Sequence, residues 1–219
     1  MSTGMLKFYM TPGSCSTGIH ILLEELDILY EAHLVNLYAG ENNKDDFLAL
    51  NPKASIPLLI TEQGQVISEF QAIAWWLARA YPKAELLPHS LDDEIRVLEM
   101  MAYTIGHLHG QEFTRIFTGE KYCINPDDID QVKRKGVSIV DECFKIIDKQ
   151  LQQQDYLVGS FSIADVALFY PEFWAVHSKL SLPPACARHF ETMMSRPSVR
   201  RVLFEEGYNP EQLAVNSPC

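Results

Sequence analysis

Residues 6–16 read LKFYMTPGSCS, a short apolar run that ends in a proline-glycine turn and then reaches Cys15. The run Leu6–Met10 predicts a strand, and apolar residues at helical spacing over residues 19–26 predict a helix that starts near Ser14. A cysteine at the first turn of a helix faces unpaired N–H groups and the positive end of the helix dipole, which favour a thiolate. A small, buried, apolar cysteine is an equally good interpretation of this stretch alone.

Strand-like stretches occur only in the first third of the chain. The strand candidates are Leu6–Met10, Tyr30–Val35, Leu58–Thr61 and Gln65–Ile67, the last two joined by a hairpin signal at residues 62–64. The helix candidates start near Ser14 and cover Asn43–Ala49 and Glu69–Tyr81. This order, β-α-β-α-β-β-α, predicts a compact α/β unit.

After a polar linker over residues 83–90, every pattern is helical. Two apolar stripes have three-four spacing: Ile95, Leu98, Ala102, Ile105 and His109, then Val132, Gly136, Ile139, Cys143 and Ile146. Ser162 and Asp165 predict a capping box at the start of a third helix, which Pro171 is expected to interrupt with a kink. Shorter helices are expected at Pro183–Ser195 and Pro197–Glu206. The predicted domains are therefore residues 5–82, α/β, and residues 91–207, all-helical, with a tail over residues 208–219.

Composition narrows the class of protein. The 219 residues, 47% hydrophobic and 21% charged, fit one large domain or two small ones, and we favour two. Five widely spaced cysteines (Cys15, Cys123, Cys143, Cys186 and Cys219) suggest neither a disulfide framework nor a zinc site, so we expect no metal and a reducing compartment. No leader pattern and no run of about 18 apolar residues occurs, which predicts a cytoplasmic protein without a membrane partner.

Charge argues against a nucleic-acid partner. The formal net charge is −11, whereas phosphate binding needs clustered Lys and Arg on one face. The one dense basic run, Lys133–Lys135, follows Asp127, Asp128 and Asp130 in a helical pattern, so it is interpreted as a solvated helix face.

Two further loops have ligand-binding potential. Pro57 stands directly before an apolar strand, and a cis Ile56–Pro57 bond would turn the backbone of Ile56 outward to pair with an extended peptide; from sequence alone an ordinary trans proline is favoured. Glu69 opens the next helix, where an acid usually complements the helix dipole. Free N–H groups at the same place can hold a ligand carboxylate while Glu69 takes a ligand ammonium.

Four motifs, in order, carry a resemblance to a known family. They are TPGSCS at residues 11–16, NPKASIPLL at 51–59, SEFQAI at 68–73 and SIAD at 162–165. With the helical second half, they resemble the cytosolic glutathione transferases over Met5–Gly207, most closely the bacterial beta class. The resemblance implies a thioredoxin-like N-terminal domain, an all-helical C-terminal domain, a cleft between them, a homodimer, and glutathione as cosubstrate.

The resemblance also implies roles for glutathione-site residues. Cys15 would contact the glutathione sulfur, and the backbone of Ile56, beside a cis Pro57, would pair with the cysteinyl unit. Glu69 and the N–H of Phe70 would hold the γ-glutamyl end, with Lys53 in the same binding set.

The second substrate's site follows from the same resemblance. His109 is expected to act in the cleft, with His107 as a substitute because the following motif aligns only after a one-residue insertion. Met10, Phe113 and Trp174 would line a hydrophobic pocket. On residue type alone, His109 continues an apolar stripe and is better interpreted as a core histidine bonded to a backbone carbonyl; the resemblance makes the two interpretations about equal. Trp174 is more often core than ligand platform.

This chain departs from the family pattern at three places. Phe70 stands where the family has Ser or Gly, Met10 stands where the beta class has a tyrosine, and a lysine after the second strand is missing. Tyr9 points to the opposite face of the strand from Met10, so it is a poor replacement. We therefore expect no catalysis through a tyrosine hydroxyl and an altered affinity for glutathione.

The leading hypothesis is conjugation of the glutathione thiolate to small apolar electrophiles, a detoxification reaction in which Cys15 donates a hydrogen bond or positions the sulfur. With a disulfide or peroxide as substrate, Cys15 itself would exchange through a mixed disulfide. A glutathione-dependent isomerase is disfavoured because the stretch after Cys15 offers only His20 to hold a diacid. A ligand-binding protein without catalysis is the remaining alternative, since fold alone does not fix function.

Overall fold

The computed structural model describes residues 4–213, which form two compact units. The first unit comprises the chain up to Leu87 together with Arg196–Pro210, and the second comprises Pro88–Ser195 together with the described residues from Glu211 to Leu213. The predicted helical domain ended at residue 207, so its C-terminal boundary is wrong. The physical reason is helix α9 (Pro197–Glu205), which packs against α1 (Ser16–Glu25). The predicted tail beyond residue 213 lies outside the described residues.

The first unit is built on a four-stranded sheet in the order β2-β1-β3-β4. Its strands are β1 (Leu6–Met10), β2 (Tyr30–Leu34), β3 (Leu58–Ile60) and β4 (Val66–Ser68). β1 pairs parallel with β2 and antiparallel with β3, so that Phe8 lies opposite Ala32 on one side and Leu59 on the other. β3 and β4 form the predicted antiparallel hairpin. The predicted strand ends agree with these bounds to within one residue.

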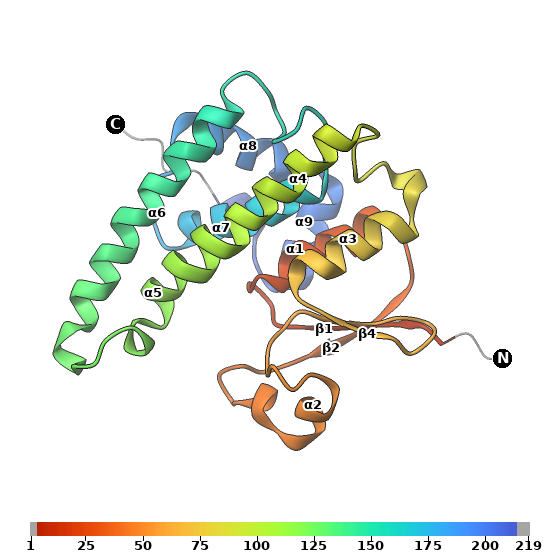
Figure 1. Ribbon diagram of the computed structural model, residues 1–219, viewed down its shortest axis with the longest axis horizontal. Coiled ribbons are helices and arrows are strands. Elements are labelled where there is room, and N and C mark those ends of the chain that lie inside the picture. Colours follow the sequence, from red (N-terminus) through yellow and green to blue (C-terminus); the bar gives the residue numbers. More distant parts are fainter. Residues whose placement is uncertain (1–3, 214–219) are drawn as a thin grey trace. The chain divides into compact units, whose positions relative to one another are not determined.

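Helices cover both faces of this sheet. In Figure 1, α1 and α3 (Phe70–Ala80) lie on one face, and α2 (Asp45–Leu50) lies on the other. Leu6, Phe8 and Met10 are buried, whereas Phe47 of α2 contacts Tyr9 edge to face at 6.1 Å. Short 3₁₀ turns occupy Glu41–Asn43, Pro82–Ala84 and Pro210–Gln212. The alternation of side chains along β1 therefore divides the core between the two faces.

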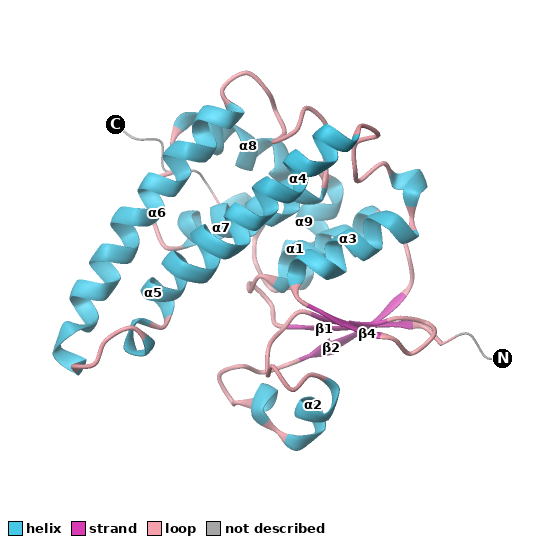
Figure 2. Cartoon of the chain, viewed as in Figure 1, coloured by secondary structure: helices cyan, strands magenta, loops and turns pink. Residues whose placement is uncertain are grey.

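The second unit is all helical (Figure 2). Its α-helices are α4 (Leu91–Tyr103), α5 (Thr114–Phe117), α6 (Ile129–Leu151), α7 (Ile163–His177) and α8 (Pro184–Met194). A π-helix, η3 (Thr104–Phe113), joins α4 to α5, and 3₁₀ turns at Gly119–Lys121 and Pro126–Asp128 lead into α6. A π-helix is what an insertion into an α-helix produces, which fits the one-residue insertion needed to align this segment.

Two expectations for α7 have different outcomes. Ser162 Oγ accepts the Ala164 N–H at 3.2 Å and the Ser162 N–H donates to Asp165 at 2.8 Å, which confirms the capping box. The expected interruption at Pro171 is wrong, because α7 continues through it to His177. Almost all of α7 is buried, and packing on every side holds the helix together despite the missing N–H.

The predicted apolar stripe of the first long helix is also wrong. Ile95 is 54% exposed and Ala102 is exposed, whereas Val97, Met101 and Leu108 are buried. The buried face of this helical segment includes the polar residues Glu94 and Thr104. Because a search for apolar spacing passes over polar residues, this face was not recognised in the sequence.

On α6 the predicted stripe is partly right. Gly136 and Cys143 are buried as predicted, but Ile146 is 56% exposed, and Phe144 and Ile147 are buried instead.

Among residues 4–213, no helix has the length and apolar character needed to span a bilayer.

Candidate glutathione site

Cys15 lies in a loop that serine and threonine side chains hold in place. It caps α1 with helical backbone angles, and its thiol donates to the carbonyl oxygen of Ile56 over 3.6 Å. Ser16 Oγ donates to the Thr11 carbonyl at 3.0 Å and lies 2.6 Å from the hydroxyl oxygen of Ser14. Because these hydroxyls bond to the loop itself, the thiol is the group of this motif directed toward the Ile56 backbone.

The free Cys15 thiol does not ionise readily. Burial raises its pKa to about 12, and the carboxylate of Glu69 raises it further, although the N–H groups of Cys15 and Ser16 act in the opposite direction. The predicted contribution of the helix start is therefore present, but burial outweighs it. The expectation of a thiolate-favouring position is wrong for this thiol, which is protonated at neutral pH.

The C-terminal segment of the first unit, which includes Glu206 and Tyr208, contacts the Cys15 loop and holds it in place. The buried carboxylate of Glu206 accepts the Gly13 N–H at 2.7 Å and the Thr17 hydroxyl at 2.7 Å. Gly13 has φ +72°, and a Cβ there would lie 1.9 Å from the Tyr208 hydroxyl, so only glycine fits. No sequence pattern pointed to Glu206 or Tyr208, because nearly two hundred residues separate them from the loop.

The second and third sequence motifs place three predicted ligand-binding residues. Lys53 and Ile56 lie in the loop before β3, and Glu69 lies directly before α3. The Ile56–Pro57 peptide bond is cis, and the Lys53 Nζ atom lies 2.6 Å from Glu69 Oε1. Both side chains of this ion pair are more than half exposed, so water screens the pair and a ligand can replace either partner. Glu69 has φ +75°, a strained backbone for a residue other than glycine. Phe70 is 4% exposed, which places its side chain in the core.

Met10 does not reach a surface. It is 2% exposed and alternates with Leu6 and Phe8 on the buried face of β1. The expectation that Met10 lines a substrate pocket is therefore wrong in this structure.

In the second unit, His109 lies in an aromatic cluster. Its Nδ1 is 3.0 Å from the Tyr170 hydroxyl, and its ring meets Trp174 edge to face at 4.9 Å. Phe113 and Phe117 each contact Trp174 at 5.4 Å. Trp174 is half-buried, whereas Phe113 is fully buried and supports the cluster from below.

His109 differs from the core interpretation drawn from the sequence, in which a backbone carbonyl was its partner. Burial lowers its pKa to about 4, so the ring is neutral at pH 7, and its partner is a hydroxyl rather than a backbone carbonyl. His107 is exposed and stacks on Tyr103 at 5.3 Å, outside the aromatic cluster.

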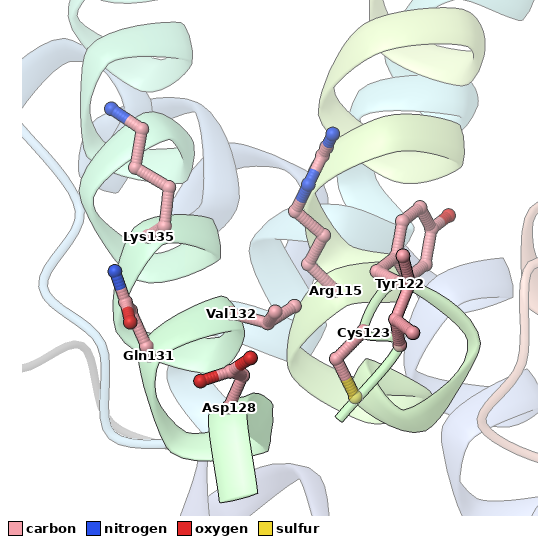
Figure 3. Close-up of a pocket in the computed structure, with 8 residues that line it drawn as sticks. Arg115, Tyr122, Cys123, Asp128, Gln131, Val132 and Lys135 are labelled. Carbon is pink, nitrogen blue, oxygen red and sulfur yellow. The ribbon is translucent and has the colours of Figure 1, made fainter. Parts of the chain in front are cut away.

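Among the surface hollows of the described residues are two in which neither Cys15 nor His109 takes part. One, of about 510 Å³ in the first unit, is lined by the stacked rings of Tyr9 and His33 and by Phe47. The other, of about 470 Å³ in the second unit, lies between Arg115 and the start of α6 (Figure 3). There Asp128, Gln131 and Lys135 face Arg115, Tyr122 and Cys123. Lys135 of the predicted basic run thus borders this hollow, and the whole run is exposed as expected.

Comparisons with known proteins agree with this architecture. The N-terminal domain model of the glutathione S-transferases matches residues 13–80, and the C-terminal domain model matches residues 103–197. Glutathione S-transferase GstA of Escherichia coli O157:H7 is 30% identical over 207 residues, which cover 92% of this chain and 99% of that protein.

Solved structures are similar as well. A glutathione transferase homologue from Sulfitobacter, solved with bound glutathione, has a TM-score of 0.86 at 25% identity and covers 94% of this chain and 99% of its own. A bacterial beta class glutathione S-transferase from Sphingomonas chungbukensis has a TM-score of 0.79 at 27% identity, covering 92% and 98%. The two units thus have the thioredoxin-like and all-helical folds of a glutathione transferase. The chain belongs to the cytosolic glutathione S-transferase family and is similar to its bacterial beta class.

Proposed function

We propose that this protein conjugates the thiolate of glutathione to small apolar electrophiles, with Cys15 as a hydrogen-bond donor to the glutathione sulfur. The observation that carries the proposal is the position of the Cys15 thiol, held at the start of α1 with its Sγ 3.6 Å from the Ile56 carbonyl oxygen. Burial raises the pKa of this thiol, and a thiol that keeps its proton can donate a hydrogen bond to a neighbouring thiolate. Exchange through a mixed disulfide would instead need Cys15 as a thiolate, which the burial disfavours.

Glutathione would bind along the two motif loops. Its cysteinyl backbone would pair with Ile56 as an added strand, as extended peptides pair with exposed backbone groups. Glu69 would take the γ-glutamyl ammonium and Lys53 a carboxylate, so that the ligand replaces the exposed Lys53–Glu69 pair. The positive φ of Glu69 supports this role, because strained backbone of this kind clusters at ligand sites.

The aromatic cluster around His109 and Trp174 is the candidate surface for the apolar second substrate. Neutral His109, fixed by Tyr170, presents a ring that holds a ligand without carrying charge. In this proposal Trp174 contributes apolar area and Phe113 only supports it.

The test compares wild type, Cys15→Ala and the control Cys123→Ser, which removes a half-buried thiol outside the site. We expect conjugation of a chlorodinitrobenzene to fall about tenfold in Cys15→Ala, since one hydrogen bond to a charged group is lost, and to be unchanged in Cys123→Ser. Incubation with oxidised glutathione should add no mass of about 305 Da at Cys15. A Cys15 adduct with complete loss of turnover would favour disulfide exchange, and glutathione binding without any turnover would favour a ligand-binding protein.

We further propose a homodimer that uses the exposed apolar side of α4. Leu91 is 69% and Ile95 54% exposed, an arrangement that a partner surface would cover. Ile95→Glu should halve the mass measured by sedimentation. Ile146→Glu is the matched control, because Ile146 is 56% exposed on α6 and its variant should remain dimeric. A monomeric wild type, or a dimeric Ile95→Glu, would contradict this arrangement.

A further inference from the structure

A second group of chemically active side chains lies where α1 meets α9, helices from opposite ends of the sequence (Figure 1). His20 and Glu24 are one turn apart on α1 and therefore lie on the same side of the helix. Glu205, the last residue of α9, faces them, with its Oε2 3.4 Å from His20 Nε2. One nitrogen of His20 and one oxygen of each glutamate lie within 4.8 Å of one another. We propose that these three side chains bind a divalent transition-metal ion such as Zn²⁺.

The ring of His20 is oriented as a metal ligand should be. Its side chain is 6% exposed, and its Nδ1 lies 2.9 Å from Oε1 of the buried Glu206. A carboxylate only accepts hydrogen bonds, so Nδ1 is the nitrogen that donates to Glu206, and Nε2 is the ring atom that can face an ion. Metal-binding histidines commonly donate their second ring N–H to a carboxylate in this way. Nε2 is also the atom that faces Glu205.

The carboxylate of Glu24, like the ring of His20, is oriented by hydrogen bonds. Its Oε1 accepts the Tyr30 hydroxyl at 3.0 Å, and its Oε2 lies 3.1 Å from Arg201 Nη1. Hydrogen bonds of this kind orient a ligating carboxylate and leave lone pairs for an ion. Glu205 is 48% exposed, so the core does not confine its side chain. A tetrahedral ion places its ligands roughly 3.3 Å apart, and since the candidate ligand atoms lie within 4.8 Å of one another, a movement of up to about 1.5 Å is required, within the reach of this side chain.

The local charge favours a cation. Glu24, Glu205 and Glu206 supply three carboxylates and Arg201 one guanidinium around the imidazole of His20, so acidic groups outnumber basic ones there. The pKa of Tyr30 is raised, first by burial and then by these three glutamates. A divalent ion neutralises the group. The imidazole ligand favours Zn²⁺ over Mg²⁺, which prefers oxygen ligands alone.

The ion would act on stability rather than on chemistry. Glu206, which orients His20, also accepts hydrogen bonds from Gly13 and Thr17 on either side of Cys15. Metal binding would therefore fasten α9 to α1 behind the Cys15 loop. An ion that binds the folded chain alone raises its stability with concentration. Without metal, His20 contacts Glu205 and Glu206 directly, and the experiment separates the two arrangements.

The test is titration of the chelator-treated full chain with Zn²⁺ by calorimetry, and with Co²⁺ by visible absorption. We expect one ion per chain, a thermal midpoint that rises with Zn²⁺, and Co²⁺ bands typical of nitrogen and oxygen ligands without thiolate charge transfer. Glu205→Gln should weaken Zn²⁺ at least about tenfold, because an exposed ligand is removed without disturbing the core. Millimolar Mg²⁺ should not compete.

Glu31→Gln is the matched control. Glu31 forms an exposed pair with His33 at 3.1 Å, similar in chemistry but outside the three-residue cluster, so its loss should leave Zn²⁺ binding unchanged. The proposal is overturned if no stoichiometric Zn²⁺ binding occurs at micromolar concentration, or if Glu205→Gln binds like wild type. Thiolate charge transfer with Co²⁺ would likewise overturn it. Conjugation activity is not the readout, so the outcome is independent of the proposed enzymatic function.

Discussion

His109 and His189 lie in the same helical unit, yet their surroundings leave the first neutral and the second positively charged at pH 7. Within residues 4–213, His109 has one hydrogen-bond partner, the hydroxyl of Tyr170, and burial lowers its pKa to about 4. Burial acts in the same direction on His189, but Glu172 at 2.8 Å and Asp165 at 3.2 Å outweigh it and raise its pKa to about 10. Burial therefore decides the charge of a histidine only where no carboxylate is in contact.

The comparison separates the histidine that we propose to contact the second substrate from a structural one. Both ring nitrogens of His189 contact carboxylates, and the side chain is fully buried. Nε2 of His109 has no partner within the described residues, and the ring is only half-buried, so it keeps an atom for a ligand. Asp165 also caps α7, which ties His189 to the start of that helix.

The largest effect should come from replacing each histidine by glutamine. His189→Gln leaves two buried carboxylates without a cation, which should cost about 3–5 kcal/mol of unfolding free energy. His109→Gln removes a neutral hydrogen bond and should cost only about 1 kcal/mol. Urea unfolding at pH 7 measures both. Equal costs for the two variants would show that His189 is not charged.

A smaller effect, on the pH dependence of stability, sharpens the same contrast. The pKa of His189 is raised from its ordinary value of 6.5 to about 10 in the folded state. Its contribution to the free energy of unfolding is therefore complete below pH 6.5 and is lost as the pH rises toward 10. His109 has a lowered pKa, so its contribution is lost as pH falls from 6.5 toward 4. Each limb has a slope of at most about 1.4 kcal/mol per pH unit.

The measurement is the difference in unfolding free energy between wild type and each variant, because groups that do not contact the replaced ring titrate in both and cancel. The alkaline limb should disappear in His189→Gln and the acid limb in His109→Gln. A difference between wild type and His189→Gln that stays constant from pH 7 to 9 would contradict the raised pKa.

Features that depend on neighbouring residues could be predicted from the sequence, whereas contacts between residues far apart in the chain could not. The Cys15 turn and the capping box at Ser162 depend on neighbouring residues, so their patterns were sufficient. The hydrogen bonds that hold the Cys15 loop come from Glu206. The sequence around Glu206 indicated only a short helix, so these bonds could not be predicted.

Helical periodicity also had a physical limit. It assumes a constant number of residues per turn and an apolar buried face, and the π-helix η3 and the buried Glu94 and Thr104 break both assumptions. The same pattern could not show whether Tyr170 or a backbone carbonyl would bond His109, because the partner lies on another helix. The raised pKa of Cys15 depends on burial by the folded unit, which no local motif encodes.

The smallest effect expected is on catalysis. A neutral His109 that positions an electrophile contributes about one hydrogen bond, so His109→Phe should lower kcat/KM at most about tenfold. The shape of the pH profile between pH 5 and 8 should not change, because the ring does not titrate there. A general base would behave differently, with a loss of about 10²–10⁴-fold and the disappearance of an inflection. His107→Phe, on an exposed ring stacked against Tyr103, is the control and should leave turnover unchanged.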